Sequence, residues 1–202
     1  MDYGLSHSCS GIGPPLTAEE QAAPPPSIAA GYYLRLAFDI ARWDNVAIRR
    51  AARDPDSLFY GAVLCAVTSA IIFLGTALPR ILRDSAVNAG KLFWQVLLGL
   101  LFVWLSMGLI AIAQVVFCHL IGKWFLGARG TFVGITRPLL LGWFVNCLIL
   151  IPFAGPFAVA IAWTAVMARV FEEADGIART HAWFISGGIN AIFLALQYLL
   201  PH

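Results

Sequence analysis

The segment between His119 and Gly142 contains the residue types that bind phosphate, namely glycines, a lysine and two arginines within otherwise apolar sequence. A nucleotide-binding P-loop has the pattern GxxxxGK[ST] after a buried strand, so that backbone amides surround the phosphates and the hydroxyl residue binds magnesium. Here Lys123 does follow Gly122, but Trp124 occupies the hydroxyl position and no strand precedes the segment. The segment is therefore predicted to be a helix end, a short loop and the start of a second helix.

Histidine and cysteine form no catalytic or metal-binding pattern in this sequence. Cys65, Cys118 and Cys147 fall in apolar blocks without CxxC or CxxxH spacing, which is typical of small apolar fillers at helix interfaces. His119 is predicted to be a solvated histidine at a helix end, because no second ligand has a workable spacing on the same helix face. HExxH and GxSxG motifs and an intramembrane aspartate pair are missing as well. We therefore expect no enzyme activity, no metal site and no cofactor.

Placing a polar side chain in lipid costs free energy, so each polar residue inside an apolar block needs an explanation, either structural or functional. Arg137 can extend its long stem back to the membrane interface, or it can bind lipid headgroups or an anion. Arg169 is followed three and four residues later by Glu172 and Glu173, a spacing that favours a local ion pair. Asn146 and Asn190 are predicted to form hydrogen bonds between helices, with a substrate contact as the alternative.

The composition is that of a membrane protein. Of 202 residues, 60% are hydrophobic and 12% are charged, and the net charge of +2 gives no indication of a nucleic-acid partner. Blocks of the length that spans a bilayer occur at 58–79, 92–121, 131–153, 154–171 and 183–200. Because lipid cannot hydrogen-bond to the backbone and the blocks show no alternation, they are predicted to be helices. The fold class is all-α, a polytopic membrane protein with five transmembrane helices.

The sequence before the first block divides into two parts. Residues 1–30 are Pro-rich and are predicted to be a disordered tail. Residues 31–57 have helical periodicity followed by a linker, with Leu36 and Trp43 on an apolar face and arginines on the other. We interpret this as an amphipathic helix in the membrane interface; packing against the helix bundle is the alternative.

Basic residues near the ends of the predicted spans indicate the orientation. One group would share a side with the N-terminus: Arg42, Arg49, Arg50, Arg53, Lys123, Arg129 and Arg179. The smaller group on the opposite side comprises Arg80, Arg83 and Lys91. Because cytoplasmic loops carry an excess of lysine and arginine, the N-terminus is predicted to be cytoplasmic and the C-terminus outside.

Two segments carry a family resemblance. HLIGKWFLGARGTFVGITRPLLLGWFVNCLILIPFAGPF, from His119, resembles the central pattern of the Yip (Ypt-interacting protein) domain family, and FEEADGIARTHA, from Phe171, resembles the acidic-then-G-I-[SA]-R segment before that family's last span. The resemblance implies a five-span bundle with a cytoplasmic N-terminus. Eukaryotic members associate with small Rab-type GTPases. Since this chain lacks their acidic D-L-Y-G-P-type stretch, the resemblance favours a prokaryotic plasma (inner) membrane protein.

Together these features predict a non-enzymatic integral membrane protein that organises protein or lipid partners at its cytoplasmic face, in membrane trafficking or organisation. We expect membrane lipids and a protein partner to bind this protein. A small GTPase is the expected protein partner only by family analogy. The sequence leaves open whether the chain forms a homo-oligomer. The candidate contact residues are His119, Lys123, Arg129, Arg137, Arg169, Glu173 and Arg179. The alternative is a small-molecule or ion transporter in which Arg137, Asn146 and Asn190 line a path.

Overall fold

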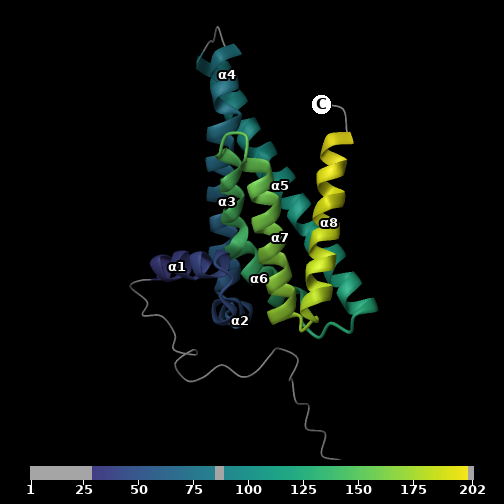
Figure 1. The fold of residues 1–202 in the computed structure, drawn as a ribbon. Coiled ribbons are helices and arrows are strands. Elements are labelled where there is room, and N and C mark those ends of the chain that lie inside the picture. Colours follow the sequence, from purple (N-terminus) through teal and green to yellow (C-terminus); the bar gives the residue numbers. More distant parts are fainter. Residues whose placement is uncertain (1–28, 85–88, 200–202) are drawn as a thin grey trace, which may run out of the picture.

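The computed structural model describes residues 29–84 and 89–199, and all the regular structure in these ranges is helical, with no strand (Figure 1). Nearly all of the predicted disordered tail, residues 1–28, lies outside the described residues. The all-α prediction is therefore confirmed. In chain order the helices are α1 (Ala29–Ala41), α2 (Asn45–Arg53), α3 (Ser57–Thr76), α4 (Leu78–Asp84), α5 (Ala89–Phe125), α6 (Phe132–Gly142), the 3-10 helix η2 (Trp143–Leu150), α7 (Gly155–Ala174) and α8 (Arg179–Leu199).

Polar side chains fix where several of these helices begin. The Thr131 hydroxyl accepts a hydrogen bond from the Gly134 amide at 3.1 Å and so caps α6, close to the predicted start. Asp44 caps α2 by accepting from the amide of Val46 at 2.8 Å. Asp54, before α3, accepts from the Ser57 hydroxyl at 2.9 Å. Short polar segments thus set the helix boundaries that the apolar runs leave undefined.

The amphipathic segment differs from its prediction in two ways. It forms two helices, because Trp43 has a positive φ of 66°, which interrupts the helical conformation between α1 and α2. The apolar face of α1 packs against the bundle, with Leu36 and Ile40 buried, while Trp43 is 45% exposed instead of lying on that face. The structure therefore shows the packing against the bundle that was the alternative interpretation, and the position of the segment in a membrane interface stays a prediction.

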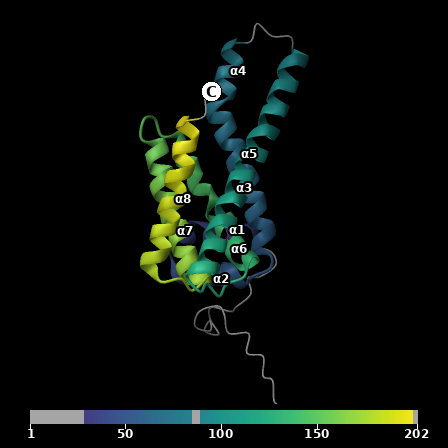
Figure 2. The same ribbon diagram turned by 90° about the vertical axis from the view of Figure 1, so that its right-hand side faces the viewer.

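Figures 1 and 2 show α3, α7 and α8 running roughly along the same axis, with α7 beside α8 and with α6 and η2 between α7 and α3, while α1 and α2 lie at one end of the bundle. The loops 126–131 and 175–178 lie at the same end. We call this end, with α1, α2 and the two loops, the basic end. The end of α4, the beginning of α5 and the beginning of α7 lie at the opposite end, where α4 and α5 extend beyond α7 and α8 (Figure 2).

Three helical segments are long and apolar enough to cross a membrane: Ser57–Arg83, Gly90–Phe125 and Phe132–Leu150. They correspond to the first three predicted spans. The second predicted span, 92–121, is the longest of the five, and α5 extends it to 37 residues, which at about 1.5 Å per residue is on the order of 55 Å. The third begins as an α-helix and continues as the 3-10 helix η2, a change that the sequence did not predict.

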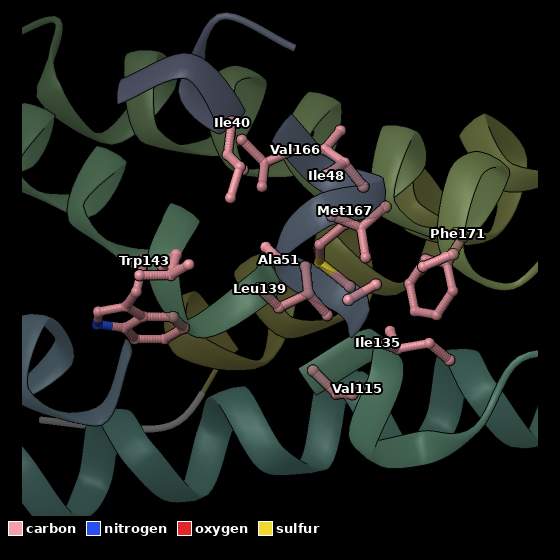
Figure 3. Close-up of a cluster of buried hydrophobic side chains, with 14 of the residues drawn as sticks. Ile40, Ile48, Ala51, Val115, Ile135, Leu139, Trp143, Val166, Met167 and Phe171 are labelled. Atoms are coloured by element: carbon pink, nitrogen blue, oxygen red, sulfur yellow. The ribbon is translucent and has the colours of Figure 1, made fainter. Parts of the chain in front are cut away.

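The core lies where α1, α2, α6 and α7 meet (Figure 3). The fully buried side chains include Ile40 from α1, Ile48 from α2, Ile135 from α6 and Met167 from α7. Leu139 from α6 is only 2% exposed. Gly142 allows the close approach, since a Cβ there would lie 2.8 Å from Val166 Cγ1. The basic end is therefore a packed part of the bundle.

Candidate functional site

The predicted contact residues all lie toward the basic end, but their environments differ. Lys123, Arg129 and Arg179 are exposed; Arg137, Arg169 and Glu173 are half-buried. His119 was predicted to be solvated, yet it is buried, because the loop after α7 covers the end of α5.

Asp175 joins the two loops of the basic end. One carboxylate oxygen, Oδ1, accepts from the Gly130 amide at 2.9 Å, and the Asp175 carbonyl accepts from the Arg129 amide at 3.0 Å. The other, Oδ2, lies 3.5 Å from His119 Nδ1. Asp175 is fully buried. A Cβ on Gly130 would lie 2.6 Å from Asp175 Oδ1, so this close approach requires glycine.

Burial raises the pKa of Asp175 above its usual value, and the opposing effects of His119, the Gly130 amide and Lys123 do not reverse the shift. Neither Asp175 Oδ2 nor His119 Nδ1 has a hydrogen-bond partner in the described part of the chain. No three histidine, cysteine or acidic residues there lie close enough to hold a metal ion. The sequence analysis missed Asp175 as a site residue, although it belongs to the acidic segment singled out for its family resemblance.

Two of the predicted contact residues hold α2 against the bundle. Arg49 NH1 donates to Glu173 Oε2 on α7 at 2.6 Å, and both side chains are largely buried. Arg137 NH1 donates to the Ala52 carbonyl at the end of α2, at 3.0 Å. Arg137 therefore reaches toward the basic end, as predicted for a long stem leaving the apolar block. Its guanidinium binds the protein backbone there.

The other predicted ion pair is local. Arg169 NH1 donates to Glu172 Oε2 at 2.9 Å, three residues along α7. The predicted local pair is thus present with Glu172, whereas Glu173 pairs with Arg49 on α2. The difference between these adjacent glutamates could not be read from their spacing to Arg169, because the Arg49 partner is far away in the sequence.

A tyrosine fixes α1 to the start of α3. The Tyr33 hydroxyl donates to Asp54 Oδ2 at 2.6 Å, and its ring stacks on Tyr60 with the centroids 4.1 Å apart. Burial and, next, the hydrogen bond to Asp54 raise the pKa of Tyr33. The hydroxyl therefore keeps its proton, and with it the donor role, throughout the physiological pH range.

The outer surface of the basic end combines exposed cations with exposed aromatic rings. The cations are Arg35, Arg42, Lys123, Arg129 and Arg179. The rings are Phe38, Trp43, Trp124, Phe125 and Trp183, each at least 38% exposed. This combination is typical of protein surfaces at a lipid headgroup layer, where aromatic rings and basic side chains are both enriched.

A second candidate site is a cavity of about 150 Å³ between α5, η2, α7 and α8. Gln114, Asn146 and Asn190 line it, together with Trp143 and Trp163. The structure thus brings together the two asparagines singled out in the sequence analysis. Arg137, the third residue of the predicted transport path, is not among the lining residues.

A chain of hydrogen bonds joins the helices around this cavity. Trp163 Nε1 donates to Gln114 Oε1 at 2.9 Å, and Gln114 Nε2 donates to Asn190 Oδ1 at 3.0 Å. Asn190 Nδ2 donates in turn to Thr164 Oγ1 at 2.7 Å. The predicted inter-helix hydrogen bonding of Asn190 is confirmed. The bond between Gln114 and Asn190 could not be predicted from the sequence, because the two residues are 76 positions apart.

The 3-10 geometry of η2 places three of its cavity-lining side chains on one face of the helix. With three residues per turn, side chains three positions apart eclipse one another. Trp143, Asn146 and Ile149 have this spacing, and all three line the cavity. In an α-helix the same residues would spread over about 120° of the helix surface. Eight residues is long for a 3-10 helix, in which runs beyond three or four residues are uncommon.

No protein-family model matches the chain, and comparisons with curated proteins and with solved structures likewise find no match.

Proposed function

We propose that this chain is a non-enzymatic integral membrane protein of the Yip-domain type that organises lipid or protein partners at the cytoplasmic face of a prokaryotic plasma membrane. The observation that carries the proposal is the basic end, where exposed cations and aromatic rings surround the packed helices α1 and α2. The family resemblance of the 119–157 segment supports it independently.

The proposal includes five transmembrane helices. Besides the three apolar segments, α7 and α8 have 20 and 21 residues, which at about 1.5 Å per residue matches a hydrocarbon core of about 30 Å. Among the lysines and arginines, only Arg80, Arg83 and Lys91 lie toward the end opposite the basic end. The positive-inside rule then gives a cytoplasmic basic end and an outside C-terminus. A reporter fused after His202 that proved cytoplasmic would contradict this topology.

Anionic lipid headgroups are the first partner that we propose for the basic end. Each lysine or arginine near an anionic membrane surface contributes about 1 kcal/mol of attraction. The side chains of Arg42, Arg129 and Arg179 are exposed. Trp43 and Trp124 beside them would lie at the headgroup level. A protein partner, a small GTPase by family analogy, would use the same surface, and crosslinking in native membranes followed by pull-down would identify it.

The lipid proposal is tested by titrating phosphatidylglycerol or phosphatidylcholine into the detergent-solubilised chain and following the thermal unfolding midpoint. The triple variant Arg42→Gln, Arg129→Gln, Arg179→Gln should weaken the apparent phosphatidylglycerol affinity by up to on the order of 100-fold. The matched control is Arg80→Gln, Arg83→Gln, Lys91→Gln at the opposite end, which should leave that affinity unchanged. If both triple variants lost the same phosphatidylglycerol affinity, the result would count against the proposal. The same holds if the two lipids raised the unfolding midpoint of the wild-type chain equally.

A second candidate function, transport of a small uncharged molecule, is favoured by one observation, that Asn146 and Asn190 line the same cavity. Ion transport is disfavoured, because no lining residue is ionisable. Uptake of a neutral solute into proteoliposomes that is lost in Asn146→Leu would support transport. Uptake equal to that of protein-free liposomes would rule against it.

A further inference from the structure

We propose that the cavity between α5, η2, α7 and α8 binds one small uncharged molecule with a flat apolar body and a single hydrogen-bond donor, of the phenol type. This binding site is separate from the basic end and does not depend on the function proposed there. Three properties of the cavity support this proposal: an unused hydrogen-bond acceptor, its size and its lack of charge.

The unused group is the side-chain oxygen of Asn146. Asn146 is 7% exposed, and its Nδ2 donates to the Trp143 carbonyl at 2.7 Å. This bond fixes the orientation of the amide, since the reverse orientation would place two acceptor oxygens against each other. Asn146 Oδ1 has no donor among the described residues. The neighbouring amides of Gln114 and Asn190 are already engaged with each other.

An accessible acceptor in an apolar cavity favours a hydrogen-bond donor, so a ligand that donates a hydrogen bond to Asn146 Oδ1 gains affinity over one that cannot. A lipid acyl chain has no donor and would leave this oxygen unpaired. Two or three water molecules could satisfy it, but they would leave the apolar walls, which include Ile149 and Val159, in contact with water. A molecule with both an apolar body and a donor satisfies both parts of the lining.

The volume of the cavity matches about one aromatic ring. The cavity is partly open, and its volume of about 150 Å³ equals that of the engineered, enclosed apolar cavity that accommodates benzene. Trp143 and Trp163 supply ring faces and edges beside this space, with their centroids 4.9 Å apart at an interplanar angle of 81°. Aromatic rings favour such edge-to-face or offset neighbours, so a flat ligand ring fits the lining better than a branched one.

The lack of charge in the lining restricts the ligand to uncharged molecules. None of the lining residues is ionisable, so a charged ligand would lose its hydration without gaining a counter-ion. Benzene, phenol and benzoate therefore separate the three requirements. Benzene fits by size alone, phenol adds the donor, and benzoate adds a charge in place of the donor.

The test uses the full chain in detergent micelles with these three probes, followed by isothermal titration calorimetry and saturation-transfer NMR. Phenol should bind saturably, benzene about tenfold more weakly because it makes no hydrogen bond, and benzoate not at all. Asn146→Leu should reduce phenol affinity to that of benzene. Ala160→Leu, which fills the cavity, should abolish saturable binding of both.

The matched control is Ala66→Leu, which places the same added volume in a different apolar groove, between α3 and α5, and should leave phenol binding unchanged. Gel filtration and thermal unfolding verify that each variant folds. The wild-type probe comparison needs no variant. A phenol signal that rises linearly with concentration, and is the same for wild type and Ala160→Leu, would mean that phenol only partitions into the micelles. That result would overturn the proposal. Saturable binding of benzoate would overturn it as well. Absence of any phenol binding would mean that the cavity holds water only.

Discussion

Asp175 Oδ2 lies 3.5 Å from His119 Nδ1, and in the described part of the chain neither atom has a hydrogen-bond partner. His119 lies near the end of α5, whereas Asp175 belongs to the loop 175–178 and also accepts a hydrogen bond from the Gly130 amide in the loop 126–131. A buried carboxylate with a raised pKa thus stands at the junction of these loops.

Replacing this carboxylate should change how stability depends on pH. Because the pKa of Asp175 is raised in the folded chain, folding favours its protonated form. The stabilisation is fully present below the unfolded value of 3.8 and is lost as the pH rises through the folded pKa. Asp175→Asn removes this loss while keeping an oxygen for the Gly130 amide. The unfolding midpoint of the variant relative to wild type should therefore increase as the pH rises from 4 toward 8. A constant difference at all pH values would contradict this expectation.

Gly130 is expected to tolerate no side chain. A Cβ there would lie 2.5 Å from the Ala174 carbonyl oxygen, and backbone atoms cannot move away cheaply. Gly130→Ala should lower the free energy of unfolding by about 1–3 kcal/mol, seen as a lower thermal midpoint. Gly108→Ala on α5 is the control, since a Cβ there meets nothing within 4 Å. That control should be neutral or more stable by up to about 1 kcal/mol. Equal midpoints for the two variants would refute the clash.

The adjacent glutamates of α7 should differ in their effect on stability. Glu173→Gln weakens the bond that holds α2 to the bundle and should cost about 1 kcal/mol, measured by thermal unfolding and by faster proteolysis around α2. Glu172→Gln weakens only the pair with Arg169 on the same helix and should cost less than about 0.5 kcal/mol. If Glu172→Gln were the more damaging change, the docking role assigned to Glu173 would be wrong.

Gln114 is expected to stabilise the contact between α5 and the α7–α8 pair. Gln114→Leu leaves Trp163 Nε1 and Asn190 Oδ1 without their partners, which should cost about 1–2 kcal/mol. Gln95, exposed on the same helix, provides the matched control. Gln95→Leu should change the unfolding midpoint by no more than the equivalent of about 0.5 kcal/mol. Indistinguishable midpoints would show that the hydrogen-bond chain contributes nothing measurable.

Local sequence features predicted much of this fold. Long apolar runs predicted helices because lipid leaves the backbone no other partner, and the beginnings of the blocks 58–79 and 131–153 predicted where α3 and α6 begin. The break at Trp43 and the 3-10 helix η2 were not predicted, because backbone geometry at these points depends on tertiary packing.

The candidate sites show the same division. The excess of basic residues at one end could be predicted from composition along the chain. The burial of His119 could not, because its neighbour Asp175 is supplied by a loop far along the sequence. Asn146 and Asn190 were recognised as costly residues in apolar blocks, but only the folded chain brings them to one cavity.

The unequal lengths of the helices bear on the surrounding bilayer. The side formed by α3, α4 and α5 rises further than the side formed by α7 and α8 (Figure 2). In the five-span topology proposed above, lipids beside the taller side would stretch, or the protein would tilt, whereas lipids beside the shorter side would stay relaxed. We expect this protein to impose a thickness gradient across its own footprint, and so to accumulate where thicker and thinner membrane regions adjoin.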